Sequence, residues 1–229
     1  MTLTLLTATG ARPEAWAICE QLMLRQTYAG PVHWIVVDDC EVAQPVTFER
    51  DRWSMSIIRP TPAWKPGENT QARNLRAGME LVRHTDRLVI IEDDDCYTPQ
   101  YLDTVSKWLD RYDLVGESYA RYYNVRTKAC QQLRNDRHAS LCATAMKGEA
   151  IKAFRVELMR TETFIDVNLW RNFRGPSVLN ATDFVTGIKG LPGRGGIGMG
   201  HRPDFKGQID ASGSILRQWT GANSGLYRG

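Results

Sequence analysis

The sequence predicts a single α/β domain with a mostly parallel central sheet flanked by helices. Strand-like and helix-like segments alternate over the first 115 residues, an order typical of a parallel sheet covered on both faces. Two segments, residues 32–37, which are apolar except for His33, and the apolar residues 88–91, have the length and β-branched content of buried strands, and each is followed by carboxylates. The 229 residues are 42% hydrophobic, which is enough for one substantial core, so we expect one domain over residues 1–229.

The first half of the chain, residues 1–115, supplies the alternating pattern. Residues 3–8 are predicted to form a strand. Residues 13–24 are predicted to form a helix because five apolar side chains share one broad face: Ala15, Trp16, Cys19, Leu22 and Met23. The order then continues with strand 32–39, strand 55–58, a loop rich in Pro, Gly and Trp over 60–69, helix 70–82, strand 88–91 and helix 99–109.

The second half, residues 116–229, has a less regular pattern. Its expected elements are strands 119–125 and 140–146 and helices 148–158 and 166–173. Residues 187–200 are dense in glycine, so we expect a flexible C-terminal segment there. Gly193–Gly198 fits G-x-G-x-x-G, but no clear strand precedes it and fewer than ~35 residues remain for the βαβ unit that a dinucleotide site requires.

Composition excludes several classes of protein. No apolar segment approaches the ~20 residues of a membrane span, and residues 1–6 lack the basic region and cleavage site of a signal peptide. We therefore expect a cytoplasmic protein without a membrane partner, and we expect no obligate protein partner. The five cysteines are scattered and form no C-x-x-C pair, so we expect them to be reduced and free of metal.

Charge is distributed unevenly along the chain, although the net charge is only +3. Residues 1–115 hold 12 Lys and Arg against 17 Asp and Glu, and residues 116–229 hold 17 against 9. The two halves therefore carry −5 and +8. A basic half indicates an anionic partner, either a diphosphate or a polyanion, unless the halves interleave in space and cancel.

The most informative segment is the acidic run Glu92–Asp95, which directly follows the apolar residues 88–91. A strand that ends in carboxylates places them at the sheet edge where open α/β sheets bind ligands. Because side chains alternate along an extended strand, we expect Glu92 and Asp94 on one side and Asp93 and Asp95 on the other.

Carboxylates this close repel one another, and a divalent cation can hold them together. Oxygen ligands in this number suit Mg²⁺ or Mn²⁺, which commonly bind nucleotide phosphates as well. The alternative interpretation is a solvated acidic turn ahead of the helix that begins near Pro99, where the helix dipole favours carboxylates.

Several motifs occur in a specific order: a first strand ending at Thr7, Val36-Val37-Asp38-Asp39, Ala72-Arg73-Asn74 on a helix, and the acidic run with Pro99 shortly after. In this order they resemble the nucleotide-binding half of the family-two, GT-A fold glycosyltransferases over about residues 3–110. Beyond that, residues 166–171 resemble the acidic segment that carries the catalytic base of this family. The resemblance implies a GT-A type domain whose first half binds a nucleotide sugar and a metal ion and whose second half binds the acceptor.

The resemblance also implies roles around the donor. The D-x-D motif of the family is represented by Glu92-x-Asp94, with Asp93-x-Asp95 as an overlapping alternative, so Asp94 or Asp95 would hold Mn²⁺ or Mg²⁺. Glu92 would orient the ribose or support the ion through water. Asp39, or Asp38 beside it, would accept a hydrogen bond from the nucleobase, which favours a uridine donor. The donor-binding set is completed by Thr7, Thr9, Arg12, Arg73 and Asp93.

Direct displacement of the sugar needs a base that removes the proton of the acceptor hydroxyl. Asp166 is the candidate, and Glu162 is the reserve, since a spacing of four would place both on one side of a helix. The alternative for Asp166 is a carboxylate that only interacts with a helix dipole.

The glycine-dense segment is interpreted as a lid loop over the diphosphate, at about residues 187–203. Lys189, Arg194 and Arg202 would supply its cations. His201 lies near its end, and many GT-A enzymes use a late histidine as a third metal ligand, although a lone histidine is often structural.

The acceptor is the least determined part of the prediction. In the basic half, aromatic residues lie among arginines, and this mixture suits a phosphate backbone and a stacked base; the aromatics are Tyr119, Tyr122, Tyr123, Trp170 and Phe173. A hydroxymethylated pyrimidine in DNA is therefore the specific hypothesis, and a soluble saccharide or small glycoside is the general one. A metal-dependent nucleotidyltransferase or phosphohydrolase, and a non-catalytic nucleotide-binding module, remain as alternatives from other classes.

Overall fold

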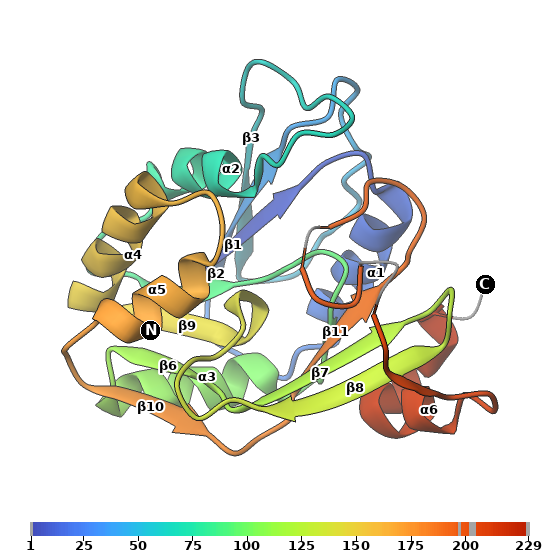
Figure 1. Cartoon of the computed structure of the whole chain (residues 1–229). Helices are drawn as coiled ribbons and strands as arrows, with labels where there is room; N and C mark the ends of the chain where they lie inside the picture. The colour runs from blue at the N-terminus through green and yellow to red at the C-terminus, as the bar shows by residue number, and fades with distance from the viewer. Residues whose placement is uncertain (1, 197, 202–204, 228–229) are drawn as a thin grey trace.

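The computed structural model describes residues 2–196, 198–201 and 205–227 (Figure 1). Within these residues, the strands form a larger central sheet and a smaller second sheet. The expected α/β class with a mostly parallel central sheet is confirmed. No helix in the described part of the chain has the length and apolar character needed to cross a membrane.

The central sheet is built around three parallel strands whose apolar residues are buried on both sides. Its strands run in the spatial order β10 (Ser177–Asn180), β6 (Leu114–Glu117), β9 (Thr144–Lys147), β4 (Arg87–Ile90), β1 (Leu3–Thr9), β2 (Val32–Asp38) and β3 (Trp53–Ile58). All neighbours pair in parallel except β9, which is antiparallel to both β4 and β6. The carboxyl ends of β1, β2 and β4 therefore lie at one edge of the sheet.

Helices cover both faces of this sheet. Alternate side chains of β2 enter opposite cores, with Trp34 and Val36 in one and Ile35 and Val37 in the other. The first core contains residues of α1 (Pro13–Leu24), α3 (Tyr101–Arg111) and α6 (Ser214–Thr220). The second contains residues of α2 (Gln71–Met79), α4 (Glu149–Arg160) and α5 (Ile165–Asn172). Figure 1 shows α2, α4 and α5 together on one side of the sheet.

The second sheet was not predicted. Its strands run in the order β12 (Gln208–Ile209), β8 (Ala129–Arg134), β7 (Tyr119–Asn124), β11 (Val185–Lys189) and β5 (Cys96–Tyr97). Strand β11 begins two residues before the segment predicted to be a lid. The residues Gly187–Lys189, expected to begin the lid loop, are therefore buried strand residues.

Two sequence-based boundaries need correction at the site. Strand β4 ends at Ile90, and the acidic run forms a turn that leads into β5, so its side chains do not alternate as in an extended strand. The segment 140–146, expected to be one strand, is divided into a short 3₁₀ helix, η1 (Leu141–Ala143), and strand β9. A second 3₁₀ segment, η2 (Gly221–Tyr227), follows α6.

Candidate functional site

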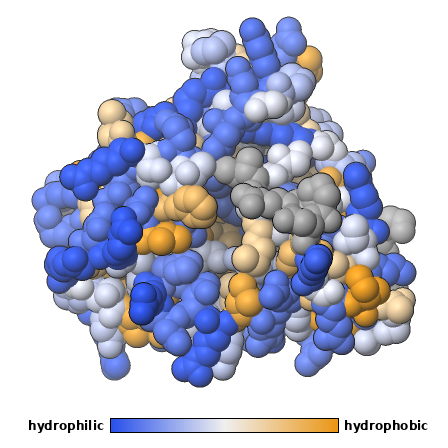
Figure 2. Space-filling model, in the orientation of Figure 1, coloured by the Kyte–Doolittle hydropathy of each residue, from blue (hydrophilic) through white to orange (hydrophobic). Residues whose placement is uncertain are grey.

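The candidate site lies at the sheet edge where β1, β2 and β4 end. Thr9 of β1 is level with Asp38 of β2, and Leu6 is level with Ile90, so the residues after each strand come together. A cavity of about 900 Å³ opens at this edge, and it is lined by residues from both halves of the chain. Figure 2 shows a hollow near the middle of this face, with apolar side chains on its left edge.

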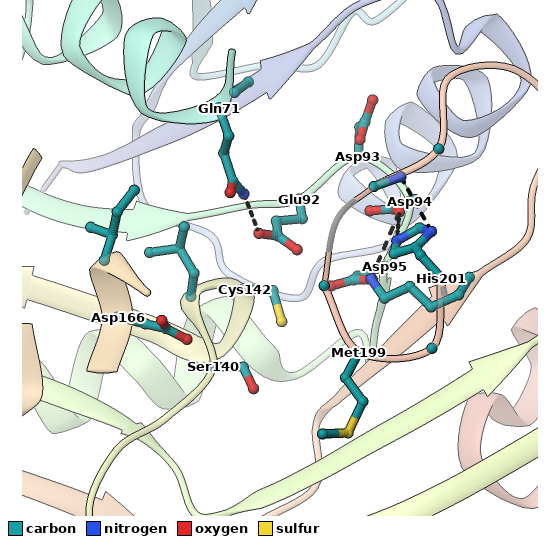
Figure 3. A pocket seen from close by; sticks show the side chains of 18 of the residues that line it. Gln71, Glu92, Asp93, Asp94, Asp95, Ser140, Cys142, Asp166, Met199 and His201 are labelled. Atoms are coloured by element: carbon teal, nitrogen blue, oxygen red, sulfur yellow. Dashed lines mark hydrogen bonds and ion pairs between the residues drawn. The ribbon is translucent and has the colours of Figure 1, made fainter. Parts of the chain in front are cut away.

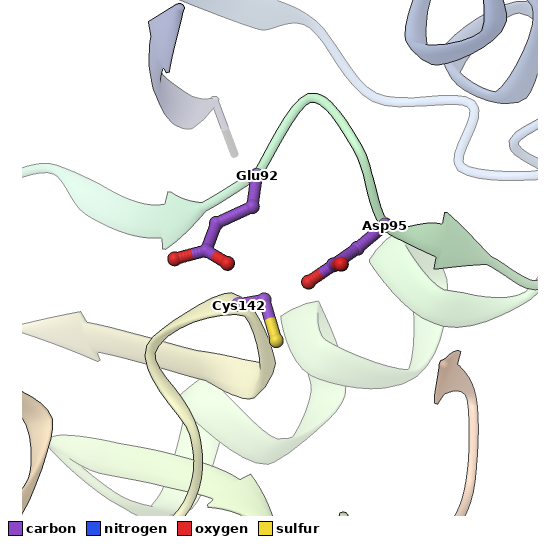
Figure 4. Close-up of side chains that lie close together, drawn as sticks. All are labelled: Glu92, Asp95 and Cys142. Carbon is purple, nitrogen blue, oxygen red and sulfur yellow. The ribbon is translucent and has the colours of Figure 1, made fainter. Parts of the chain in front are cut away.

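The turn at the end of β4 divides the acidic run into two pairs. Asp93 and Asp94 face Arg12: the guanidinium lies 3.0 Å from Asp93 Oδ1 and 3.1 Å from Asp94 Oδ2. Glu92 and Asp95 instead lie near Cys142 (Figure 4). The expected pairing of Glu92 with Asp94 and of Asp93 with Asp95 is therefore replaced by a different one, because the run is not extended.

Two buried cations partly neutralise the acidic run. Besides Arg12, the Nζ of Lys189 lies 2.8 Å from Asp95 Oδ1 and 3.7 Å from Asp94 Oδ2. The same oxygen, Asp95 Oδ1, also accepts a hydrogen bond of 3.0 Å from the backbone N–H of Ile188. Four carboxylates thus face two fixed cations, which leaves room in the charge balance for a divalent cation.

The pKa values reflect this crowding. Burial, together with the charge of Asp95, raises the pKa of Glu92 to about 8. Burial also raises the pKa of Asp93 to about 6, against the opposing effect of Arg12. Burial acts in the same direction on Asp94, but Lys189 and Arg12 outweigh it and hold the pKa of that carboxyl well below its ordinary value. Asp94, the carboxylate that contacts both cations, therefore remains charged most easily.

The residues around Asp95 fit a metal ion. Asp95 is fully buried, and its Oδ2 has no hydrogen-bond partner. Glu92, Asp95 and Cys142 offer ligand atoms that all lie within 4.8 Å of one another (Figure 4). Glu92 Oε1 accepts a hydrogen bond of 2.9 Å from Gln71 Nε2, which orients the carboxylate. These three side chains could hold a divalent cation. Sequence reasoning did not find Cys142, because a lone cysteine has no ligand spacing.

His201 lies against Asp94 rather than in this group. Its Nε2 is 3.5 Å from Asp94 Oδ2, and its Nδ1 accepts a hydrogen bond of 3.2 Å from the backbone N–H of Gly196 (Figure 3). The N–H of Gly196 requires an unprotonated Nδ1, so the proton of the neutral ring is on Nε2 and points to Asp94. The structure thus brings two of the expected metal ligands together, Asp94 and His201, but as a hydrogen-bonding pair.

The two aspartates that follow β2 differ in their surroundings. Asp38 accepts hydrogen bonds from the backbone N–H groups of Cys40 and Gln44 and pairs with Arg59, so it shapes the loop after the strand. Asp39 is fully buried and pairs with Arg73 at 3.1 Å and with Arg194 at 2.9 Å. Asp39 does not line the cavity itself and is connected to it through Arg194, which does.

The first loop is represented at the site by Arg12 and Thr9. The Oγ1 of Thr9 donates a hydrogen bond of 2.6 Å to Asp93 Oδ2 and accepts one of 2.8 Å from Gln44 Nε2. Thr7, also expected to contact the donor, is buried in the sheet, where its Oγ1 accepts a hydrogen bond from Trp34 Nε1. Thr7 does not line the cavity, because it lies two residues before the end of β1 and its side chain is buried within the sheet.

Asp166 lines the cavity from its other side (Figure 3). It lies in the first turn of α5, and burial raises the pKa of its carboxyl above the ordinary value. Glu162 lies in the connection before α5, so the helical spacing assumed for the two residues is absent. Its carboxylate pairs with Arg76 at 3.0 Å, its side chain is 58% exposed, and it does not line the cavity.

The expected lid cations have different locations. Lys189 is buried beneath the acidic run, as described above. Arg194 lies at the edge of the cavity and contacts Asp39. Arg202 lies outside the residues that the structure describes. Lys189 and Arg194 therefore do not form one cationic patch on a loop.

Most of the aromatic residues expected to stack a base do not line the cavity. Tyr123 is buried and donates to Asp210, and Trp170 donates to Thr144; of the five, Tyr122 lines the cavity. Sequence reasoning missed Phe164, which lines the cavity two residues before Asp166 and is 71% exposed. Its backbone is left-handed, with φ of 55°, a conformation that is uncommon outside glycine and is often found at functional sites.

Comparison with known proteins supports the fold. No protein-family model matches the chain, and no curated protein matches its sequence. A crystal structure of S. aureus TarS is similar at a TM-score of 0.59 and 10% identity, over 82% of this chain and 37% of that chain. The structure of S. aureus TarS 1–349 in complex with UDP is similar at a TM-score of 0.59 and 9% identity, over 82% of this chain and 60% of that chain. The structure of the same protein in complex with UDP-GlcNAc is similar at a TM-score of 0.51 and 10% identity, over 86% of this chain and 60% of that chain.

The chain therefore spans between 37% and 60% of the length of these structures. At this level of identity the likeness concerns the fold, and the expected GT-A type glycosyltransferase fold is confirmed.

Proposed function

We propose that this protein is a metal-dependent, inverting glycosyltransferase that transfers a sugar from a nucleoside diphosphate sugar, with UDP-sugars favoured, to a hydroxyl acceptor. One observation carries the proposal: the acidic run with its cations and Asp166 line the same cavity from different sides (Figure 3). Direct displacement needs this arrangement, because the leaving diphosphate and the incoming hydroxyl occupy opposite faces of the sugar.

Three residues that line the cavity have separate roles in the proposed reaction. Arg12 is buried beside Asp93 and Asp94, where its positive charge favours a diphosphate oxygen at the edge of the cavity. Glu92, held by Gln71, accepts hydrogen bonds from the hydroxyl groups of the ribose. Asp166 accepts the proton of the acceptor hydroxyl as the new glycosidic bond forms, and its raised pKa suits this role.

Mn²⁺ or Mg²⁺ completes the donor site in this proposal. Asp95 and Glu92 supply free carboxylate oxygens, Cys142 lies beside them, and Asp94 is the nearest further carboxylate. When bound, such an ion stabilises the negative charge of the leaving diphosphate.

Donor binding gives the first expected result. UDP with Mn²⁺ should stabilise the protein more than GDP or TDP with Mn²⁺, and omission of the ion should remove most of the effect. At a nucleotide concentration 100 times Kd the stabilisation amounts to about 2.7 kcal/mol. Differential scanning fluorimetry with and without EDTA measures it. Absence of any shift with all three nucleotides would count against the proposed function.

A transfer assay with labelled donors separates the reaction classes. With a donor labelled in the sugar and, separately, in the β-phosphate, a glycosyltransferase moves only the sugar label to the acceptor. A nucleotidyltransferase or phosphohydrolase leaves the acceptor without a sugar label, and a binding module leaves the donor intact.

For the acceptor we propose a hydroxymethylated pyrimidine in DNA. Phe164 supports it, because an exposed aromatic ring beside Asp166 offers a stacking surface for a planar group in the cavity. The cavity edge on this side also carries His138 and Gln131 from the basic half. A saccharide acceptor remains the alternative.

Replacement of Phe164 by Ala distinguishes these acceptors. Stacking on an aromatic residue contributes about 1–3 kcal/mol per base, so KM for hydroxymethylated DNA should rise about 5- to 150-fold. Phe164→Tyr keeps the ring and should keep KM. Met159→Ala removes a similarly exposed side chain on α4 that does not line the cavity, and it serves as the matched control. An unchanged KM in Phe164→Ala would argue against a base at this position.

A further inference from the structure

Two exposed arginines lead away from the cavity at the carboxyl end of α5. Val167, in the first turn of this helix, lines the cavity, and Arg171 follows it at a spacing of four residues. Side chains at this spacing lie on the same face of a helix, so Arg171 lies about 6 Å further along the axis than Val167. Arg174 lies just beyond the end of α5, and its Nη1 donates to the carbonyl oxygen of Arg171 at 2.7 Å.

A third exposed arginine, Arg137, lies on a different segment that reaches the same cavity. It belongs to the connection between β8 and η1, and its neighbour His138 lines the cavity. The next residue, Ala139, packs beside α5: a Cβ on Gly116 would lie 2.4 Å from the Cβ of Ala139 and 2.8 Å from the ring of Trp170. The connection and α5 therefore border the cavity side by side.

These three arginines form no ion pair with a carboxylate in the described part of the chain. Arg171 donates to the side-chain oxygen of Asn168, and Arg174 donates to a backbone carbonyl. Two other exposed arginines differ, since Arg134 pairs with Asp136 at 3.2 Å and Arg160 pairs with Glu157 at 3.4 Å. A guanidinium without a carboxylate partner can bind a phosphate without breaking an existing ion pair.

The position of these cations suits a nucleic-acid backbone. The cavity beside them carries the exposed ring of Phe164 and the carboxyl of Asp166. A base that leaves the stack to enter such a pocket remains joined to the phosphates of its strand, so cations outside the pocket can hold the strand while the base is inside. A neutral saccharide would gain no comparable charge interaction from guanidinium groups outside the cavity.

We propose that Arg137, Arg171 and Arg174 bind phosphate groups of the DNA acceptor beside the cavity, so that a hydroxymethylated pyrimidine enters it and reaches Asp166. The inference rests on the proposed function, and it adds the residues that bind the backbone. Because phosphate contacts carry no sequence information, these arginines should bind modified and unmodified DNA equally well.

Fluorescence anisotropy with a labelled duplex, prepared with and without one hydroxymethylated pyrimidine, tests the proposal between about 50 and 200 mM salt. The logarithm of the association constant should fall linearly with the logarithm of the salt concentration. Replacement of each arginine by Gln should reduce the magnitude of this slope by about 0.9, and the triple variant should reduce it by about 2.7. Each variant should weaken binding to both duplexes by the same factor.

Arg111→Gln is the matched control. Arg111 is also an exposed arginine without a described ion pair, but it lies on α3, which packs in the core on the other face of the sheet. Its replacement should leave the slope unchanged. Arg171→Lys keeps the charge and should keep the slope, and it provides the comparison if Arg171→Gln does not fold.

Three outcomes separate the inference from the proposed function. An unchanged slope in the triple variant, or an equal decrease in Arg111→Gln, would overturn the inference and leave the DNA acceptor in place. Absence of DNA binding, with UDP and Mn²⁺ still bound, would also overturn it and would favour the saccharide acceptor. Failure of the unmodified protein to bind UDP with Mn²⁺ would instead overturn the proposed function.

Discussion

Replacement of Asp166 by Asn should lower kcat by about 10²- to 10⁴-fold, the usual contribution of a general base. The amide keeps the size of the side chain but cannot take the proton of the acceptor hydroxyl. Asp166 does not contact the acidic run in any described hydrogen bond or ion pair, so donor affinity should be unchanged. Single-turnover rates with a labelled UDP-sugar, together with UDP affinity from dialysis, measure the two quantities separately.

The pH profile gives this experiment a second readout. Burial raises the pKa of Asp166, and the base is active when deprotonated, so the rate should rise with pH through a value above the ordinary 3.8. That rising limb should be missing in Asp166→Asn. Glu162→Gln is the matched control, because Glu162 is exposed and pairs with Arg76 outside the cavity. A large loss of kcat in Glu162→Gln, with little change in Asp166→Asn, would reverse the assignment of the two residues.

The part of the site that the sequence predicted comes from short-range signals. An apolar run followed by carboxylates identifies a strand end, so Asp39 and the acidic run could be located from residues adjacent in the chain. The alternation of strands and helices in the first half is also local, and the central sheet was predicted from it. Within the acidic run the prediction was wrong about the pairing, since the end of β4 at Ile90 depends on hydrogen bonds to other strands.

The residues that were missed depend on contacts between distant segments. Cys142 has no neighbouring ligand in the sequence, and it meets Glu92 and Asp95 only because η1 and β9 pack beside β4. Phe164 precedes the buried Ile165, so an apolar pattern predicts burial for both and cannot indicate that one ring is exposed. Such juxtapositions require the tertiary structure.

Lys189 is the clearest case of a residue whose role changed between sequence and structure. The glycine-dense segment 187–200 predicted a flexible loop in which Lys189 supplies a cation to the diphosphate. Strand β11 pairs instead with both β5 and β7, and Lys189 is 5% exposed beneath the acidic run. Its pKa lies well above the ordinary value: Asp94 and Asp95 outweigh the opposing effect of burial. Lys189 is therefore expected to contribute to folding stability.

Lys189→Met should therefore destabilise the protein strongly. The change leaves Asp95 buried without its charged partner, and loss of one member of a buried ion pair costs about 3–5 kcal/mol. For a chain of this size the melting temperature should fall by about 6 to 20 °C. Chemical denaturation and thermal melts in the presence of EDTA measure the effect without a contribution from bound metal.

A double variant tests whether the ion pair itself is responsible. In Lys189→Met with Asp95→Asn the buried carboxylate is also removed, while the amide oxygen can still accept from the backbone N–H of Ile188. Most of the lost stability should return, since replacing both partners of a buried pair costs much less than removing one. Lys152→Met is the surface control: Lys152 pairs with Glu149 on the exposed side of α4, and its removal should cost less than about 1 kcal/mol. If Lys189→Met melted like the unmodified protein and only weakened UDP binding, the lysine would be a donor-binding cation, as the sequence alone had indicated.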